Sequence, residues 1–352
     1  MRWPIVVLAA LAAFPTVAGA EVWREQSRQD ADARGLSTIE IHNARGRIDV
    51  TPSSDGRIHL TAIKIVHLDG AGRARDLADQ ITVDTDRRGD HYVVEVHYPQ
   101  RASFHIDFFG ALRGFDREFE VRIAAEVPPA LGVEARSASG VVTSEGVGGA
   151  QLLRTASGDI EVRSAGRRVE VSSSSGAIEA SDLGASARIH SVSGDLTLHH
   201  VRGALDASTS SGAIRITGAE DSVAATSVSG DIKLDRAPHG LLAHSSSGSL
   251  EAEAVAGGVR AGTVSGDIRL AVRDPLRGLE ASSSSGSIRV ALDPAVRCVL
   301  DMRTSSGSLD VHLPVEMQTM TRRHLEARVR GGTIPASLRS VSGNITVTGG
   351  GQ

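Results

Sequence analysis

A short signature returns at a fixed interval over most of this 352-residue chain, and it constrains the fold more than any other feature. Eight of its glycines are spaced 18 residues apart, and three further copies follow less regularly. They are Gly140, Gly158, Gly176, Gly194, Gly212, Gly230, Gly248 and Gly266, then Gly286, Gly307 and Gly343. A fixed period of this size predicts an array of stacked units.

Each unit contains two stretches in which apolar and polar residues alternate. After the glycine, the second and fourth positions are apolar, as in Ile160 and Val162; before it, the seventh and fifth are apolar, as in Val169 and Val171. A period of two predicts strands. No two-residue hairpin signal recurs, so like positions should stack in parallel strands about 4.8 Å apart. The sequence predicts an all-β fold: a parallel β-solenoid (β-helix) of 18-residue, two-strand coils, with right-handed crossovers.

Two columns of hydroxyl residues accompany the glycine. Ser precedes it in all eleven units, and Ser or Thr stands three positions before it. The alternation places both columns on the core side, so we expect hydroxyls that bond a neighbouring hydroxyl or the turn backbone. The alternative is an outward-facing array that matches a regular surface such as ice or a glycan, and the alternation argues against it.

Asp follows the glycine in every second unit of the regular array. Alternate units lie about 9.6 Å apart, too far for two carboxylates to share a calcium ion, so neither a metal nor another cofactor is expected. The 36-residue rhythm is either structural or a trace of duplication. We predict structural turn and ladder roles for Ser157, Gly158, Asp159, Ser193, Gly194, Asp195, Ser229, Gly230, Asp231, Ser265, Gly266 and Asp267.

Residues 1–20 have the pattern of a signal peptide, with Arg2, an apolar run and a small-residue site at Ala18 to Ala20. The run is too short to span a bilayer comfortably, so we expect an exported protein, periplasmic, extracellular or at the cell surface, with no transmembrane segment in the mature chain. A net charge of −4 without Lys/Arg blocks argues against nucleic-acid partners. The single cysteine, Cys298, has the inward phase and should be buried.

The chain before the regular array lacks the period. Residues 21–132 are predicted to form an N-terminal β-rich cap and irregular first solenoid part, and residues 133–352 the regular repeats with irregular C-terminal coils. Residues 21–37 suggest a loose leader or helical turn, and residues 71–80 a short helix. Gly46 opens an early copy of the signature. Strands are expected at 58–66, 81–85, 92–98 and 119–126, and residues 345–347 should form an exposed strand edge.

Every aromatic residue lies at or before Phe119, and five phenylalanines crowd into one segment. They are Phe104, Phe108, Phe109, Phe115 and Phe119. They either plug the end of the array or form a candidate partner-binding surface, because a contiguous exposed aromatic patch rarely lacks a use.

The early "GRIDV" element, the "VPP" entry before "GVEARSASGVV" and the repeated units that end in "SVSGNITV" together resemble a known group. This group consists of exported bacterial β-strand-repeat proteins of unknown function that are named as candidate adhesins. The resemblance implies a β-solenoid, secretion or surface display, and an adhesive or envelope role. It brings no catalytic motif.

Three functions compete on these observations. The first is a non-enzymatic exported scaffold, adhesin-like, that binds an envelope component, a glycan or another copy of itself. The second is a polysaccharide-active enzyme of the β-helix kind, disfavoured because the coils from Gly140 to Gly286 are nearly uniform and leave no loops for a cleft. The third is self-assembly through the C-terminal strand edge, which is compatible with the first.

Overall fold

The computed structural model describes residues 22–67, 71–99 and 119–350, and its contacts divide the chain into two compact units, Met1–Gly166 (unit 1) and Arg167–Gln352 (unit 2). Within the described residues, no helix combines the length and the apolar character needed to cross a membrane. The aromatic segment before Phe119 and the predicted signal peptide lie outside the described ranges.

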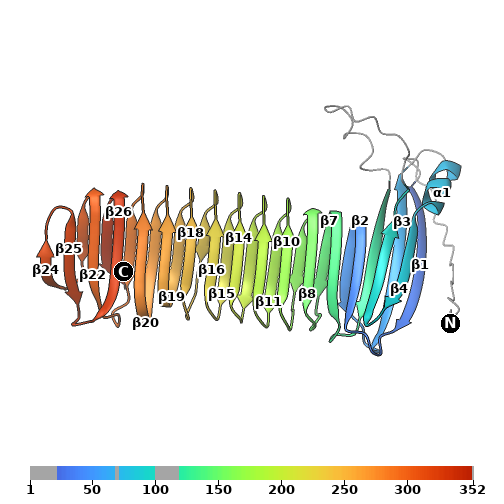
Figure 1. The fold of residues 1–352 in the computed structure, drawn as a ribbon, viewed down its shortest axis with the longest axis horizontal. Coiled ribbons are helices and arrows are strands. Elements are labelled where there is room, and N and C mark those ends of the chain that lie inside the picture. Colours follow the sequence, from blue (N-terminus) through green and yellow to red (C-terminus); the bar gives the residue numbers. More distant parts are fainter. Residues whose placement is uncertain (1–21, 68–70, 100–118, 351–352) are drawn as a thin grey trace. The chain divides into compact units, whose positions relative to one another are not determined.

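Unit 1 is a β-sheet assembly with one helix. Its elements are β1 (Val22–Asp32), β2 (Thr38–Pro52), β3 (Arg57–His67), α1 (Ala71–Asp79), β4 (Thr82–Arg88), β5 (His91–His97), β6 (Phe119–Val127), β7 (Gly132–Glu145), β8 (Gln151–Ser157) and β9 (Ile160–Arg163) (Figure 1). The predicted helix and the four strands predicted before the array are confirmed, with small differences at their ends.

The long strand β2 organises unit 1. Its first half pairs in parallel with β5 and its second half with β6, while β7 pairs with both halves on the other side. Gly46 pairs with Gly140 and Ile48 with Val142, so the early copy of the signature is in register with the first regular one. β3 pairs antiparallel with β6, and β4 antiparallel with β5.

The prediction of a loose leader or helical turn at residues 21–37 is wrong for most of that stretch. β1 pairs antiparallel with β3 from Val22 to Asp32. No residue of β1 is fully buried; exposed and half-buried side chains alternate along it. The strand therefore carries no apolar alternation, and the backbone ladder with β3 determines its conformation.

Unit 2 is an all-β, solenoid-like stack of parallel strands. Its strands are β10 (Val169–Ser173), β11 (Ile178–Leu183), β12 (Ala187–Ser191), β13 (Leu196–Val201), β14 (Leu205–Thr209), β15 (Ile214–Ala219), β16 (Val223–Ser227), β17 (Ile232–Leu234), β18 (Leu241–Ser245), β19 (Leu250–Thr263), β20 (Ile268–Ser283), β21 (Ile288–Leu292), β22 (Cys298–Ser306), β23 (Leu309–His312), β24 (Glu316–Met320), β25 (His324–Val329), β26 (Ile334–Ser342) and β27 (Ile345–Gly349).

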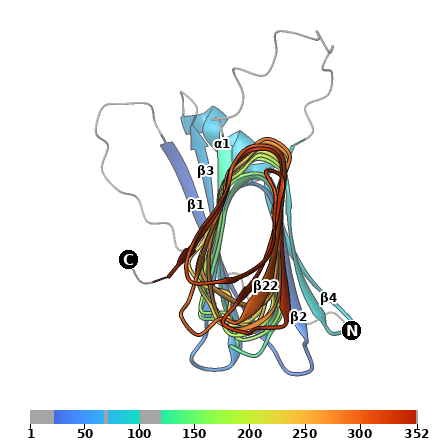
Figure 2. The ribbon, with the colours of Figure 1, turned by 90° about the vertical axis from the view of Figure 1, so that its left-hand side faces the viewer.

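From β10 to β19, parallel pairing joins each residue to the one 18 positions later, and between β20 and β21 the offset is 20. Val169 of β10 pairs with Ala187 of β12, and β12 pairs with β14 in the same register. Ile178 of β11 pairs with Leu196 of β13 in the same way. Viewed along the stack, successive repeats of unit 2 overlie one another as flattened loops (Figure 2). The apolar residues of both strands are buried between them, including Ile189, Leu198 and Ile214 at 0% exposure. The predicted all-β fold with a long parallel-strand array is confirmed.

The last repeat of the chain does not lie at the end of the stack. β26 pairs with β20 on one side and with β22 on the other, and β27 lies between β21 and β23. The antiparallel hairpin β24–β25 follows β23, and β25 pairs with β22. The prediction that residues 345–347 form an exposed edge is therefore wrong, because Ile345 pairs with both Ile288 and Leu309.

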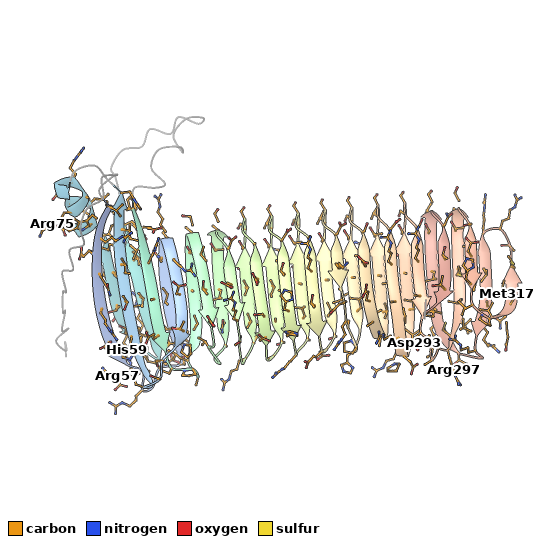
Figure 3. The ribbon with its side chains drawn as sticks, turned by 180° about the vertical axis from the view of Figure 1, so that it is seen from behind. Arg57, His59, Arg75, Asp293, Arg297 and Met317 are labelled. Carbon is orange, nitrogen blue, oxygen red and sulfur yellow. The ribbon has the colours of Figure 1, made fainter. Side chains whose placement is uncertain are left out.

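Two strands at this end of unit 2 each have a single partner among the described strands. β23 pairs with β27 alone, and β24 with β25 alone. Met317 on β24 is exposed, and Figure 3 shows its side chain at the end of the strand array. Cys298 at the start of β22 is fully buried, as predicted, and burial raises the pKa of its thiol to about 11.

Candidate functional site

The signature glycines allow neighbouring repeats to approach closely. A Cβ built on Gly194 would overlap the carbonyl oxygen of Gly176, and one on Gly230 that of Gly212. Gly266 meets Gly248 in the same way. None of these glycines has a positive φ, so the requirement is space between two backbones. The predicted turn glycines are therefore structural packing positions.

The hydroxyl column three positions before the glycine is buried, as predicted. Ser227 donates a hydrogen bond to the carbonyl oxygen of Gly212 at 3.3 Å and accepts one from the amide of Gly230 at 2.8 Å. Ser245 makes the corresponding pair of bonds. These two hydroxyls thus join the turn of their own repeat to the turn of the preceding one.

The serine immediately before the glycine is exposed, and the prediction that it faces the core is wrong. Ser193, Ser229 and Ser265 all point to solvent. In these three repeats the second strand ends three positions before the glycine, as β12 does at Ser191, so a bend intervenes and the strand alternation no longer holds. An outward serine column does exist, on the turn and beside the strands.

The aspartate column binds backbone of the following repeat. The Oδ1 atoms of Asp195, Asp231 and Asp267 accept hydrogen bonds of 2.8 to 2.9 Å from the amides of Ala213, Ser249 and Ser287. Among the described residues, no group of three His, Cys, Asp or Glu side chains has an arrangement that fits a metal ion.

Phe119 is the one predicted partner-binding residue within the described ranges; Phe104, Phe108, Phe109 and Phe115 lie outside them. Its ring stacks on Tyr98 with centroids 5.4 Å apart, and the guanidinium of Arg45 lies 5.1 Å from the ring centroid. The Tyr98 hydroxyl bonds Asn43 and the carbonyl of Arg45, and burial raises the pKa of Tyr98. Phe119 is half-buried in this cluster.

A groove of about 930 Å³ crosses the strands of unit 2, and we call it the cross-strand groove. Its floor is formed by the position eight before each glycine, where side chains are small or absent: Ser186, Ala204, Ser222, Gly240, Gly258 and Gly278. The same position is Arg168 at one end and Pro335 at the other, seven repeat steps or about 34 Å away. Bulky residues thus bound a column of small ones.

The walls of the cross-strand groove come from the start of the second strand in each repeat. Buried apolar residues flank the floor: Leu205, Val223, Leu241, Val259 and Leu279. The outward residues beside them are Arg188, Asp206, Ala224, Leu242, Arg260 and Glu280. The middle of this outward row is uncharged, and Leu242 is 53% exposed there.

Arginine is the main charged residue of the groove. Arg168, Arg188, Arg260 and Arg277 line it, against only two carboxylates. Arg188 contacts Asp206 at 3.2 Å and Arg260 contacts Glu280 at 3.5 Å. All four of these side chains are more than half exposed, so these ion pairs contribute little stability.

Our sequence reasoning did not find this groove. The inward positions and the turn positions were compared between repeats, whereas the position eight before the glycine was not. The available signal is its restriction to Ser, Ala and Gly through six consecutive repeats, between Arg168 and Val299 in chain order.

Parallel strands stacked at an 18-residue offset and crossed by a groove define a solenoid-like β-repeat protein. Residues 36–256 and 242–348 match the model of the Toastrack DUF4097 family, and the chain belongs to this family. A search of curated proteins finds no match.

Several solved structures are similar to this chain. One is named a "putative cell adhesion protein" from Clostridium sporogenes ATCC 15579, at 7% identity over 93% of this chain and 100% of that chain, with a TM-score of 0.23. A "putative adhesin" from Bacteroides fragilis NCTC 9343 has 14% identity over 92% and 97%, with a TM-score of 0.32. A "putative lipid binding protein" from Parabacteroides distasonis ATCC 8503 has 11% identity over 92% and 96%, with a TM-score of 0.31.

Proposed function

We propose that this protein is an exported, non-enzymatic binding scaffold of the adhesin kind, and that the cross-strand groove receives an elongated ligand. In this proposal residues 1–20 direct export to the periplasm or cell surface, the strand pairs act as 18-residue coils of a β-solenoid, and residues 21–132 form its cap. The observation that supports this proposal is the groove: in six consecutive repeats, the position eight before the glycine has a small side chain or none. Stacking of the repeats does not require small side chains at this position, because Arg168 and Pro335 occupy the same position in the repeats at the two ends of the groove.

A polysaccharide-cleaving enzyme has less support from the same groove. Its two lining carboxylates, Asp206 and Glu280, lie four repeats apart, which the strand spacing makes about 19 Å. Glycosidases that use a carboxylate pair hold the two groups about 5 to 9.5 Å apart.

The structure offers a direct way to fill the groove without disturbing the backbone. A Cβ on Gly258 or Gly278 meets nothing within 4 Å, and neither residue has a positive φ. Gly349 has the same freedom but lies outside the groove, so it supplies a matched control. We would compare the chain lacking residues 1–20 with its Gly258→Trp, Gly278→Trp and Gly349→Trp variants.

The test is binding to whole envelope fractions and to a glycan array, after circular dichroism has shown that each variant folds. We expect the two groove variants to lose binding and the Gly349→Trp variant to keep it. A variant with Phe104, Phe108, Phe109 and Phe115 all changed to Ser tests the aromatic segment separately. Loss of binding in this variant alone would assign ligand recognition to the aromatic segment and contradict the groove.

A further inference from the structure

We propose that the cross-strand groove recognises a linear acidic polysaccharide, whose acid groups are bound by Arg260 and Arg277 toward one end and by Arg168 and Arg188 toward the other. This inference rests on the proposed binding function and specifies its ligand. It follows from the charge, the spacing and the direction of the groove.

The charge of the lining favours an anionic ligand. Four lining arginines face two lining carboxylates, and a third carboxylate, Glu170, contacts Arg168 at 3.6 Å from beside the groove. Within the described residues, Arg277 has no carboxylate at ion-pairing distance. The pairs that Arg188 and Arg260 form are solvent-exposed, with side-chain exposures between 53% and 75%. Exposed pairs of this kind contribute little stability, so an acid group on a ligand can replace either carboxylate at little cost. A guanidinium also binds a planar carboxylate through two parallel hydrogen bonds.

Arg277 is positioned by an irregularity in the array. The interval from Gly266 to Gly286 is 20 residues, whereas the preceding intervals are 18. The pairing of β19 with β20 shifts here: Gly257 pairs with Leu276 but Gly258 with Gly278, which leaves Arg277 as the extra residue. Bulges of this kind redirect a side chain and are frequent beside functional sites. The insertion places an arginine on the groove, in a repeat whose floor residue is glycine.

The direction of the groove favours a polysaccharide over a peptide. An extended peptide gains affinity by pairing its backbone with a strand edge, parallel to the strands. This groove crosses the strands, so it presents one position from each repeat and no continuous backbone ladder. Its floor instead offers the hydroxyls of Ser186 and Ser222, which can bond sugar hydroxyls, and the exposed Leu242 in its middle suits the apolar face of a sugar ring.

The spacing of the arginines sets a minimum length. Arg188 and Arg260 belong to strands four repeats apart, about 19 Å by the strand spacing. A ligand must contain several sugar units to reach both. A short fragment contacts one end alone and loses the gain that linked contacts provide.

The experiment measures binding of the full chain without residues 1–20 to polygalacturonate, to its dimer, to neutral dextran and to polyphosphate. The test variant is Arg260→Gln with Arg277→Gln. The matched control is Arg269→Gln with Arg289→Gln, which removes the same charge from outside the groove. We expect polygalacturonate to bind best, and the dimer and dextran weakly. The test variant should raise the Kd about tenfold while the control does not, because two exposed arginine contacts together amount to about 1.4 kcal/mol, which is tenfold in Kd.

Four results would overturn the inference. Equal weakening in both double variants, or equal binding of polyphosphate and polygalacturonate, would show general charge attraction. If wild type binds none of the acidic probes, the ligand class is wrong. If Gly258→Trp abolishes binding of dextran or of an envelope component that the Arg260→Gln and Arg277→Gln variant still binds, the binding function stands and only the acidic ligand is rejected.

Discussion

At the scale of single residues, the distance between repeats is set by the absence of side chains. Each signature glycine of unit 2 lies against the carbonyl of the signature glycine in the repeat before it. These contacts follow the order of the repeats in space and not their order in the chain, because Gly343 lies against Gly286, and Gly307 against Gly343. Any larger residue in this column must separate two backbones that the strands on either side hold together.

We predict that Gly230→Ala destabilises the protein by about 2 kcal/mol or more, because the added methyl overlaps the backbone of Gly212. The measurement is the urea midpoint followed by far-UV circular dichroism. Gly258→Ala is the control, since its Cβ meets nothing within 4 Å; it should be neutral or stabilising by up to about 1 kcal/mol. Similar destabilisation by both substitutions would refute the close-approach explanation.

At the scale of elements, the insertion of β26 and β27 restores an alternation at the position after the glycine that is interrupted in chain order. The Asn344 side chain accepts a hydrogen bond from the amide of Ser308 at 2.9 Å, as Asp267 does from Ser287. In spatial order, the residue after the glycine therefore alternates between Asp or Asn and a smaller Ala or Ser, through to Ser308. If the repeats stacked in chain order, Ser287 would precede Ser308, and the Ser308 amide would lack this partner.

We predict that Asn344→Ala lowers the stability of unit 2 by about 1 kcal/mol, because the Ser308 amide loses its acceptor. Asn344→Asp keeps an acceptor oxygen and should stay within about 0.5 kcal/mol of wild type. Hydrogen exchange at the Ser308 amide is the local readout and should accelerate in Asn344→Ala alone. Unchanged exchange there would mean that the bond does not help to hold the inserted repeat.

The strand β1 is held at one end by a histidine between two carboxylates. His59 on β3 contacts Asp30 of β1 at 2.7 Å and Asp55 at 2.9 Å. Figure 3 shows His59 and Arg57 at the same end of the unit 1 strands. The bonds to Asp30 and then Asp55 raise the pKa of His59, and the bond from His59 lowers the pKa of Asp30.

We predict that attachment of β1 weakens as pH rises above the ordinary histidine value of 6.5. A raised histidine pKa stabilises the fold fully below 6.5, and this contribution is lost as pH rises through the higher folded value. The lowered pKa of Asp30 acts at the other end, where stability is lost as pH falls below the ordinary value of 3.8. Attachment should therefore be strongest between these two values.

Trp23 on β1 reports this attachment. It is the only tryptophan once residues 1–20 are removed, so fluorescence-detected urea unfolding follows β1 directly. The midpoint of this transition should decline above pH 6.5 in wild type, and His59→Gln should remove the decline. A decline of the same size in His59→Gln would assign the pH dependence to other groups.

At the scale of the whole molecule, the two-repeat rhythm is structural. The exposed valines Val192, Val228, Val264 and Val341 fall in every second repeat of unit 2, counted in space, in the same repeats as Asp195, Asp231, Asp267 and Asn344. Duplication along the chain would place the pattern in chain order, which the inserted repeat breaks. The hydrogen bonds across repeats give the rhythm its physical reason.

We predict that polygalacturonate at about one hundred times its Kd stabilises the groove-bearing repeats by about 2.7 kcal/mol. Hydrogen exchange of the whole chain should slow within residues 186–280, with residues 22–67 unaffected. The Gly258→Trp variant, in which the groove is filled, should show no change. Slowing spread evenly over both segments would indicate binding elsewhere on the chain.

The strand pairs, the inward positions and the buried hydroxyl column are predictable from the sequence alone, because all of these follow from a period of two within a period of 18. The sequence also located α1 and the strands β3 to β6. The exposure of Ser193 and its equivalents escaped it, since a bend resets the alternation. The position of the last repeat follows from three-dimensional packing, because its Val341 and Asn344 alternate with Ser287 and Ser308 only when the repeats are taken in spatial order. The groove also depends on the tertiary structure. Its column of small residues forms a continuous surface only when the repeats are stacked, and stacking also places arginines from separate repeats along the same groove.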